Sequence, residues 1–172
     1  MTPSQLLFTE HVAILKALVI AEQATEKLEL GTDLGKEFWT NLVIFLKGFA
    51  DECHHANEEQ FFLPQMRRQN EEFSKMTIRI LEEHVKGRQF IKDLEEALKQ
   101  YFSGEKFAKN LMINAIRNYI VLLRPHIVLE NINFPKAQNK FSKETIDKMS
   151  QEFKKPDKKY SVILKKLTKA ND

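Results

Sequence analysis

Hydrophobic residues recur every three to four positions along most of this chain, with polar residues between them. This spacing places the apolar side chains on one face of a helix and is typical of amphipathic helices packed around a core. Glycines, prolines and short polar stretches interrupt the pattern and mark where helices begin and end. The pattern predicts four long helices, over about residues 3–30, 35–62, 71–102 and 105–133.

Short connections between long helices favour antiparallel neighbours, so we expect an all-α, up-down-up-down four-helix bundle. Pro125 lies inside the fourth predicted helix, where it removes a backbone donor and should bend the helix. Beyond the bundle the spacing predicts two shorter helices, over residues 142–153 and about 160–167. We therefore divide the chain into a bundle, residues 1–137, and a C-terminal helical extension, residues 138–172, that packs on the bundle or trails from it.

The composition supports a single globular domain of this class. The chain has 172 residues, of which 42% are hydrophobic and 30% charged, and five glycines leave few tight turns for an all-β fold. Cys53 is the single cysteine, which excludes an internal disulfide and favours a reducing compartment. The N-terminus lacks the features of a signal peptide, and no uninterrupted apolar run approaches about 20 residues. We expect a cytoplasmic protein that does not span or bind a membrane.

Positive charge is concentrated at the C-terminus. Residues 136–172 contain eleven lysines against five acidic side chains, whereas the rest of the chain is net negative. A basic segment of this kind can contact nucleic acid or an acidic protein partner. Because the segment has no arginine cluster and few aromatic residues, the pattern favours a solvated lysine-rich helix over a nucleic-acid-binding arm. The sequence identifies no protein partner.

Two predicted helices repeat the same short motif, a histidine four residues before a glutamate. The motif occurs as His54 to Glu58 in the second helix and as His126 to Glu130 in the fourth. Positions i and i+4 share a helix face, so an imidazole and a carboxylate at this spacing can bind a metal ion from one side. The first and third helices each add a histidine in the same phase, which gives the chain a weak two-fold repetition.

These residues fall on the apolar stripes of their helices, where uncompensated polar groups are costly. An unpaired buried imidazole costs on the order of 1–3 kcal/mol, and a buried carboxylate needs a cation or a proton. A shared metal centre satisfies all of these groups at once. The predicted metal ligands are His11, His54, Glu58, His84, His126 and Glu130.

His55 and Glu59 offer an alternative pair with the same spacing. Each is one residue, about 100° around an α-helix, from its neighbour in the predicted stripe. Alignment with Ala50 and the hydrophobic residues before it favours His54 and Glu58 as the inward pair and predicts that His55 faces away. Cys53 is best interpreted as a small core or boundary residue, since a thiolate would not suit these nitrogen and oxygen donors.

The donor types limit the metal. Imidazoles and carboxylates suit iron, manganese or zinc and exclude a calcium site, and carboxylates inside a bundle typically bridge two ions. A ferritin-like site requires a Glu-x-x-His motif on two helices, and this chain has only one, from Glu52 to His55.

The same residues carry a resemblance to a known family. Over about residues 5–137 the chain resembles the hemerythrin-like HHE cation-binding family. Four segments carry the resemblance: Glu10 with His11, residues 53–59, Glu83 to Gly87, and residues 126–131. The resemblance implies a four-helix bundle around a non-haem di-iron centre, bridged by an oxo or hydroxo group and two carboxylates. Carried over, the four histidines of the predicted set are nitrogen ligands, and Glu58 and Glu130 are the bridges.

The chain also departs from oxygen-carrying hemerythrins, which have a fifth histidine one turn after the third-helix ligand. Arg88 stands at that position, beside Gly87, and should turn outward and leave an iron position open. Four imidazoles, two bridging carboxylates and an oxygen bridge then fill ten of the twelve positions around two octahedral ions. Two open positions favour reaction with oxygen, nitric oxide or peroxide over reversible carriage.

The resemblance therefore implies a di-iron protein that binds or senses a small diatomic molecule or peroxide, or that handles iron in redox stress. The alternative is an enzyme, either a repair protein for iron–sulfur clusters or a redox enzyme that consumes peroxide or nitric oxide. Tyr119, two turns before His126, is a candidate proton or electron donor for such a reaction, although its position in the pattern favours a role in core packing. No catalytic residue is assigned from the sequence.

Overall fold

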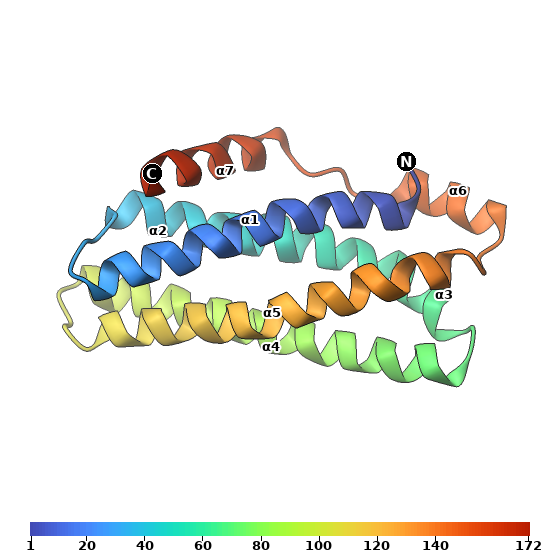
Figure 1. The fold of residues 1–172 in the computed structure, drawn as a ribbon, viewed down its shortest axis with the longest axis horizontal. Helices are drawn as coiled ribbons and strands as arrows, with labels where there is room; N and C mark the ends of the chain where they lie inside the picture. The colour runs from blue at the N-terminus through green and yellow to red at the C-terminus, as the bar shows by residue number, and fades with distance from the viewer.

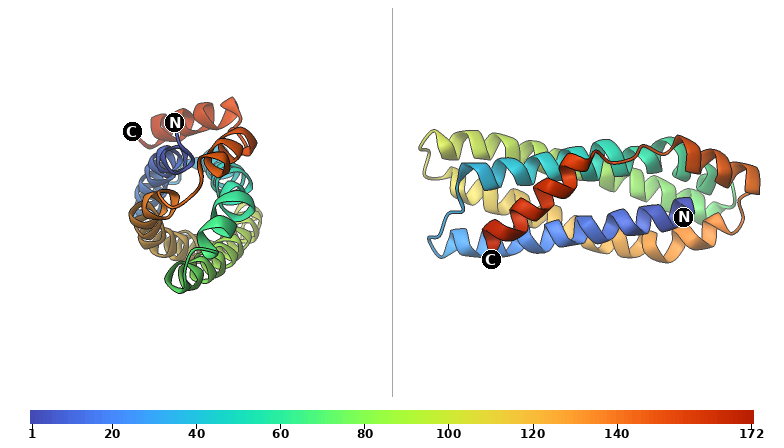
Figure 2. Two further views of the ribbon diagram at one scale, coloured as in Figure 1. Left: turned by 90° about the vertical axis from the view of Figure 1, so that its right-hand side faces the viewer. Right: turned by 90° about the horizontal axis from the view of Figure 1, so that it is seen from above.

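The computed structural model describes all 172 residues and is 85% helical, without strands. Four antiparallel rods lie side by side around a common core, and the C-terminal extension packs outside them (Figure 1; Figure 2). The predicted all-α bundle is confirmed. The elements are α1 (Pro3–Glu29), α2 (Gly35–Ile44), η1 (Phe45–His55), η2 (Glu58–Phe62), α3 (Leu63–Arg67), α4 (Glu71–Phe102), α5 (Ala108–Gln138), α6 (Lys143–Glu152) and α7 (Lys158–Asn171).

Local chemistry explains where the rods begin. Thr2 caps α1 with a capping box closed by Gln5, and Pro3 occupies the first turn, where its missing donor costs nothing. Asn70 caps α4 by accepting a hydrogen bond from the backbone N–H of Phe73. Gly104, in the left-handed region with φ of 100°, follows the end of α4 and reverses the chain.

The second rod is not a uniform α-helix. It runs from α2 through the π-helical segments η1 and η2 into α3, so the rod spans the predicted helix 35–62 without a break, but much of it is wound as a π-helix. In a π-helix each backbone N–H bonds to the carbonyl five residues earlier, which adds a residue to each turn. Such segments often accompany functional sites, because they change which side chains face inward.

The fourth rod is longer than the sequence predicts. We expected it to end near residue 133, yet α5 continues through both Pro125 and Pro135 to Gln138. A proline removes one backbone hydrogen bond, but Phe134 and Ala137 on either side of Pro135 are buried in a hydrophobic cluster. Their packing keeps this turn helical against the local preference.

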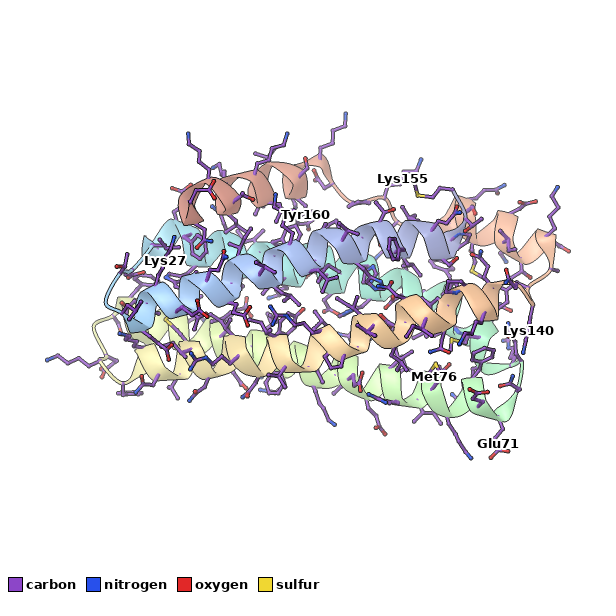
Figure 3. All side chains as sticks on the ribbon, viewed as in Figure 1. Lys27, Glu71, Met76, Lys140, Lys155 and Tyr160 are labelled. Carbon is purple, nitrogen blue, oxygen red and sulfur yellow. The ribbon has the colours of Figure 1, made fainter.

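The extension packs on the outside of the bundle. Helix α7 crosses α1 and α2 obliquely (Figure 2), and Tyr160 and Leu167 join the main hydrophobic cluster. Tyr160 lies over Gly48, where an added Cβ would clash with the Tyr160 hydroxyl, so the glycine permits the close approach. The lysines of α6 and α7 are exposed, as is Lys155 in the connection between the two helices (Figure 3).

Helix α1 has the length and apolar composition of a membrane span, as core helices of bundles often do. Half of that apolar stretch is buried inside the protein, where α1 packs against α5, α7 and η1. The expectation of a protein that does not cross a membrane remains a prediction.

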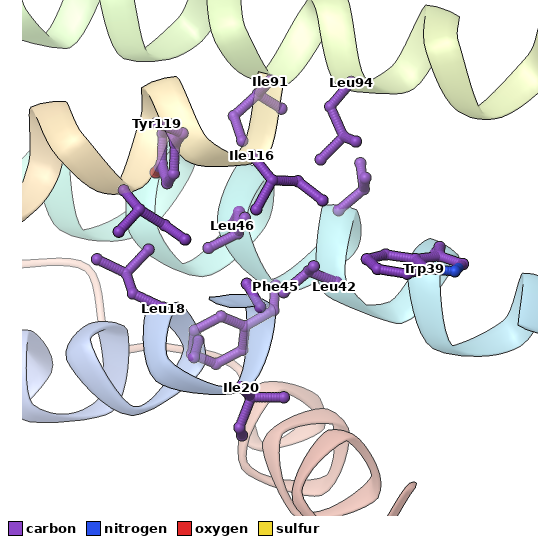
Figure 4. Packing of buried hydrophobic residues seen from close by; sticks show 14 of the residues in the cluster. Leu18, Ile20, Trp39, Leu42, Phe45, Leu46, Ile91, Leu94, Ile116 and Tyr119 are labelled. Atoms are coloured by element: carbon purple, nitrogen blue, oxygen red, sulfur yellow. The ribbon is translucent and has the colours of Figure 1, made fainter. Parts of the chain in front are cut away.

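The core divides into two hydrophobic clusters with a polar layer between them. The larger cluster fills the end near α2 and includes Trp39, Phe45 and Leu94 (Figure 4), and the smaller one fills the other end around Phe62 and Phe134. On each rod the predicted metal ligands lie between a residue of one cluster and a residue of the other; on α1, His11 lies between Leu7 and Ile14. The apolar clusters therefore exclude water from both sides of the polar layer.

Candidate metal centre

The structure brings all six predicted ligands into this polar layer. Each is at most 1% exposed, although each carries a polar or ionisable side chain. They come from four rods: His11 from α1; His54 and Glu58 from η1 and η2; His84 from α4; His126 and Glu130 from α5.

The imidazoles point toward the two carboxylates. Nε2 of His54 lies 3.1 Å from Oε1 of Glu58, and Nε2 of His84 lies 3.4 Å from Oε2 of the same carboxylate. Ligands at about 2.1 Å from one octahedral ion and at right angles to each other lie about 3 Å apart. The two oxygens of Glu58 thus face different histidines at separations that suit two ions.

Glu130 repeats this arrangement from the opposite rod. Its Oε2 lies 3.2 Å from Nε2 of His11, and its Oε1 lies 3.1 Å from Nε2 of His126. All four oxygens of Glu58 and Glu130, and Nε2 of His11, are buried without a hydrogen-bond partner. Buried polar groups of this kind are costly unless something satisfies them, and a cation between them would do so. The donor set therefore fits a pair of bound metal ions.

The donors form two overlapping groups. The two-nitrogen group consists of His11, His54, Glu58 and Glu130, whose nearest donor atoms lie within 4.8 Å of one another. The three-nitrogen group, equally compact, consists of His55, Glu58, His84 and His126. Glu58 belongs to both groups, as a bridging carboxylate would.

His55 corrects the sequence analysis, which placed this residue outside the site. It is only 3% exposed, and its ring stacks on His84 with centroids 3.9 Å apart and planes 16° apart. The prediction assumed α-helical phase, in which two consecutive side chains point in directions too different for both to face the core of the bundle. Because η1 is π-helical, both His54 and His55 face the bundle axis.

Arg88 does turn outward, as its charge predicts. Its guanidinium is partly exposed and pairs with Asp51 and Glu59 at 2.8 and 2.6 Å. The space beside His84 is not open, however, because His55 occupies it from the neighbouring rod. An imidazole therefore stands beside His84, but it comes from η1 and not from α4.

A second ring of side chains holds the imidazoles in place. In four of the five histidines, Nδ1 donates a hydrogen bond of 2.7 or 2.8 Å away from the centre, which leaves Nε2 free to face a metal. Each acceptor is the sequence neighbour of a ligand on the preceding rod: Glu10 holds His54, Glu59 holds His84, Glu83 holds His126 and Asn131 holds His11.

This ring closes around the bundle, so every rod both supplies a ligand and orients the ligand of the next. Sequence reasoning assigned no role to Glu10, Glu83 or Asn131, and it considered Glu59 only as part of an alternative ligand pair with His55. The available signal was position: each directly precedes or follows a predicted ligand, on a face that turns toward the adjacent rod. His55 is the exception, because its Nδ1 partner, Asp51, lies in its own helix at a longer 3.4 Å.

The charges in the site favour negative carboxylates. Burial opposes ionisation of Glu58, but the neighbouring His54 and His11 hold its pKa well below the usual range. Burial and the charge of Glu58 also oppose ionisation of Glu130, yet His126 and His11 lower its pKa to about 2. Both carboxylates are therefore ready to bind cations at neutral pH.

The histidines respond differently to the same site. Burial disfavours protonation of all of them, but Glu58 and Glu10 raise the pKa of His54 to about 9, and Glu130 and Glu83 raise that of His126 to about 10. Burial and the nearby His84 lower the pKa of His55 to about 3. Without metal, protons on His54 and His126 balance the carboxylates, and metal ions would displace those protons.

Cys53 takes no part in this centre. It is buried, and its thiol donates a weak hydrogen bond to the backbone carbonyl of Lys154. Burial and the charge of Glu10 raise the pKa of the thiol to about 11, so it stays protonated. This agrees with the predicted core or boundary role.

Comparison with known proteins supports the class that the fold and site define. The family model of the hemerythrin HHE cation-binding domain matches residues 2–137. The chain belongs to this family, and the resemblance seen in the sequence is confirmed. Neither a curated protein nor a solved structure matches the chain. The match ends one residue before α5 ends, and the extension lies outside it.

Proposed function

We propose that this protein holds two non-haem iron ions and binds or senses a small molecule such as oxygen or nitric oxide, or handles iron in redox stress. Membership of a cation-binding family and the two donor groups support metal binding itself. The observation that carries the proposal is the pair of carboxylates, Glu58 and Glu130, whose oxygens each face histidines on opposite sides.

The donor chemistry supports iron. Imidazole and carboxylate ligands suit iron, manganese and zinc, and a centre of five nitrogens and two carboxylates lacks the all-oxygen shell that calcium needs. Bound iron would supply redox chemistry and reversible binding of small molecules. Manganese or zinc would fit the same donors, so the metal found in the purified protein decides between them.

The number of donors supports binding over turnover. Five imidazoles and two carboxylates would hold two octahedral ions here and, with an oxygen bridge, would fill eleven of their twelve positions, one more than the sequence predicted. The remaining position belongs to the two-nitrogen group, beside His11 and His54. A single open position in a dry site suits one small ligand, and the second open position that the sequence predicted is filled by His55.

The enzyme alternative requires a group that delivers protons or electrons. Tyr119 is buried in the main hydrophobic cluster, and burial together with the charge of Asp51 raises the pKa of its hydroxyl above the ordinary value. A hydroxyl that holds its proton so firmly is a poor acid. Its surroundings support the core role.

Anaerobic loading with ferrous iron, followed by metal analysis and absorption spectroscopy, tests the proposal. We expect two ions per chain and, on admission of oxygen or nitric oxide, a spectral change that reverses when the gas is removed. Glu82→Ala, which removes an exposed glutamate of α4, is the control and should behave as the parent. Rapid oxidation with release of iron would favour iron handling, and steady consumption of peroxide would favour the enzyme. Binding of fewer than two ions would overturn the proposal.

A further inference from the structure

The C-terminal extension touches the second rod at four places. The connection between α6 and α7, residues 153–157, runs along the outside of the rod, and α7 lies over its earlier part (Figure 2). In chain order the contacts are Gly48 with Tyr160, Cys53 and Asn57 with the backbone of Lys154, and Phe61 with Phe153. Because the family match ends at residue 137, these contacts come from a part of the chain that the family model does not include.

Asn57 makes the most specific of these contacts. Its side chain is fully buried, and its amide oxygen accepts a hydrogen bond of 2.7 Å from the backbone N–H of Lys154. Its amide nitrogen donates a hydrogen bond of 3.0 Å to the carbonyl of the same residue. Lys154 lies outside any helix, so its backbone groups lack helical partners and Asn57 satisfies both. Since a buried amide without partners is costly, this reciprocal pair fixes the extension at one place on the rod.

The four contacts can form together only if the rod departs from α-helical phase. An α-helix advances about 100° per residue, so Gly48 and Phe61, thirteen positions apart, would lie about 140° apart around it. In η1 and η2 each backbone N–H bonds one residue further back, which brings more than four residues into each turn. Positions 48, 53, 57 and 61 then lie on one side of the rod. Docking of the extension therefore favours the π-helical phase over the α-helical one.

The same phase places His55 at the metal centre. His55 faces the bundle interior together with His54 because η1 is π-helical, and its ring stacks on His84. Asn57 follows two residues later and points the other way, toward the extension. A return to α-helical phase would separate Asn57 from Lys154 and turn the His55 ring away from His84. The two sets of contacts are therefore kept or lost together.

We propose that the C-terminal extension braces the metal centre, and that Asn57 is the positioning residue through which it keeps His55 facing the centre. The effect on metal binding rests on the proposed function, whereas the position of the His55 ring does not. The coupling is reciprocal, so an extension that favours the bound position of His55 is itself held more firmly when metal binds.

The first experiment uses the metal-free full chain and breaks the contact from the side of the extension. Lys154→Pro removes the N–H that Asn57 accepts, and Phe153 before it has φ of −56° and ψ of 127°, which a following proline allows. NMR of the parent should show a nuclear Overhauser effect between the rings of His55 and His84, whose centroids are 3.9 Å apart. We expect Lys154→Pro to reduce this effect by about half or more. Amide exchange should become about ten-fold faster in η1 and stay parental in α4.

Two variants of the connection are matched controls. Lys154→Ala keeps the backbone N–H and removes only the ammonium group, which lies 3.4 Å from the carbonyl of Glu52. Lys155→Pro makes the same change one residue later, where the backbone N–H has no hydrogen-bond partner in the protein. Both should keep the parental Overhauser effect. An unchanged effect in Lys154→Pro, or an equal loss in Lys155→Pro, would overturn the brace.

A double-mutant cycle tests whether Asn57 acts through the extension. Asn57→Leu, a change to a side chain of similar size, removes both hydrogen bonds from the side of the rod and should weaken the His55–His84 Overhauser effect as Lys154→Pro does. The double variant should be no worse than Asn57→Leu alone, because both changes break the same contact. Additive losses would mean that Asn57 supports η1 without the extension and would contradict the proposal.

Iron binding separates this inference from the proposed function. By competition with a chelator, we expect Lys154→Pro to weaken the ion of the three-nitrogen group by about ten-fold and to leave the other ion unchanged. Bound metal should in turn slow tryptic cleavage of the extension in the parent. Loss of the Overhauser effect in Lys154→Pro, in a protein that binds no iron, would contradict the proposed function and support the brace. Iron binding at parental affinity in a variant that has lost the effect would contradict the role of the brace at the metal centre.

Discussion

The two-nitrogen and three-nitrogen groups are built from the same rods by different means. His11 and His54 are each held by a side chain of another rod, at 2.7 and 2.8 Å. In the three-nitrogen group, His84 and His126 follow the same rule, but His55 reaches the centre only because η1 is π-helical. Side chains of neighbouring rods thus hold four of the five imidazoles, and the π-helical segment adds a fifth imidazole that makes the centre asymmetric.

This asymmetry has a chemical consequence. If each group holds one ion, the three-nitrogen group completes its octahedron and the two-nitrogen group retains the open position. The missing histidine of α4 is then no loss, since a neighbouring rod supplies an equivalent imidazole. The following variants test whether the two groups differ in this way.

Removal of the shared carboxylate should have the largest effect. Glu58→Ala takes a donor from both groups, so we expect loss of both ions and of the stability that their binding contributes, about 3 kcal/mol for each ion at metal concentrations 100-fold above the dissociation constant. Metal analysis and thermal unfolding with and without iron measure both losses. If Glu58→Ala keeps one ion at parental affinity, the groups do not share this carboxylate.

Removal of His55 should affect one group only. We expect His55→Ala to weaken the ion of the three-nitrogen group by more than the roughly 10–100-fold that loss of a supporting hydrogen bond costs, and to leave the other ion in place. This reverses the sequence-based expectation that His55→Ala retains all metal. Iron titration that shows two unequal classes of ion would establish the difference, and two parental ions would refute it.

A second substitution can return the imidazole to the rod where oxygen-carrying relatives have it. Arg88 lies one turn from His84 and lines the same cavity as His55, so we expect Arg88→His to restore iron binding in the His55→Ala background. Arg88→His alone should change iron content little, since the position it would fill is already occupied. Rescue by Arg88→Ala as well would show that relief of the arginine charge, and not a new ligand, restores binding.

Removal of the side chains that accept the Nδ1 hydrogen bonds should have a smaller effect on metal affinity, and the effect should differ between the two groups. Glu10 holds His54 at 2.8 Å, whereas Asp51 holds His55 at 3.4 Å. We expect Glu10→Ala to weaken metal binding by about 10–100-fold and Asp51→Ala by less than about 10-fold. Competition with a chelator of known affinity measures both, and equal losses would show that the longer contact shortens when metal binds.

The last comparison concerns the pH dependence of the metal-free protein. His54 and His126 have raised pKa values of about 9 and 10, so their contribution to stability is present below 6.5 and is lost as pH rises through those values. Glu130 and His55 have lowered values of about 2 and 3, so stability also falls as the solution is acidified. The midpoint of thermal unfolding should therefore be highest near pH 6.5.

His55→Ala should flatten the acid side of this profile while leaving the alkaline side unchanged, because the His55 ring resists protonation in the folded state only. The slope contributed by one such group is at most about 1.4 kcal/mol per pH unit. An unchanged acid slope would mean that the His55 ring is solvated in the metal-free protein.

Much of this architecture follows from the sequence. Leu7, Ile14 and their equivalents on the other rods fix the helical faces, and the His-x-x-x-Glu motifs place Glu58 and Glu130 opposite each other, because these patterns need only regular helical phase. The features that could not be predicted from the sequence depend on departures from regular helical phase. The π-helical segment and the continuation of α5 through Pro135 are set by tertiary packing.

The second ring of side chains, which holds the imidazoles in place, could be predicted from the sequence only in part. Glu10 and Glu83 directly precede predicted ligands, but only the arrangement of the rods shows that each holds a histidine of the next rod instead of its own neighbour. Pairwise spacing along one helix carries no such information.

The central claim is that His55 is the fifth nitrogen ligand and makes the two ions unequal. The most direct test is a crystal structure of the iron-loaded protein at a resolution that locates ligand atoms. We predict Nε2 of His55 at about 2.1 Å from the ion that His84 and His126 also bind, and a coordination position without a protein ligand on the other ion. A His55 ring turned away from the metal, with a water molecule in its place, would contradict the account.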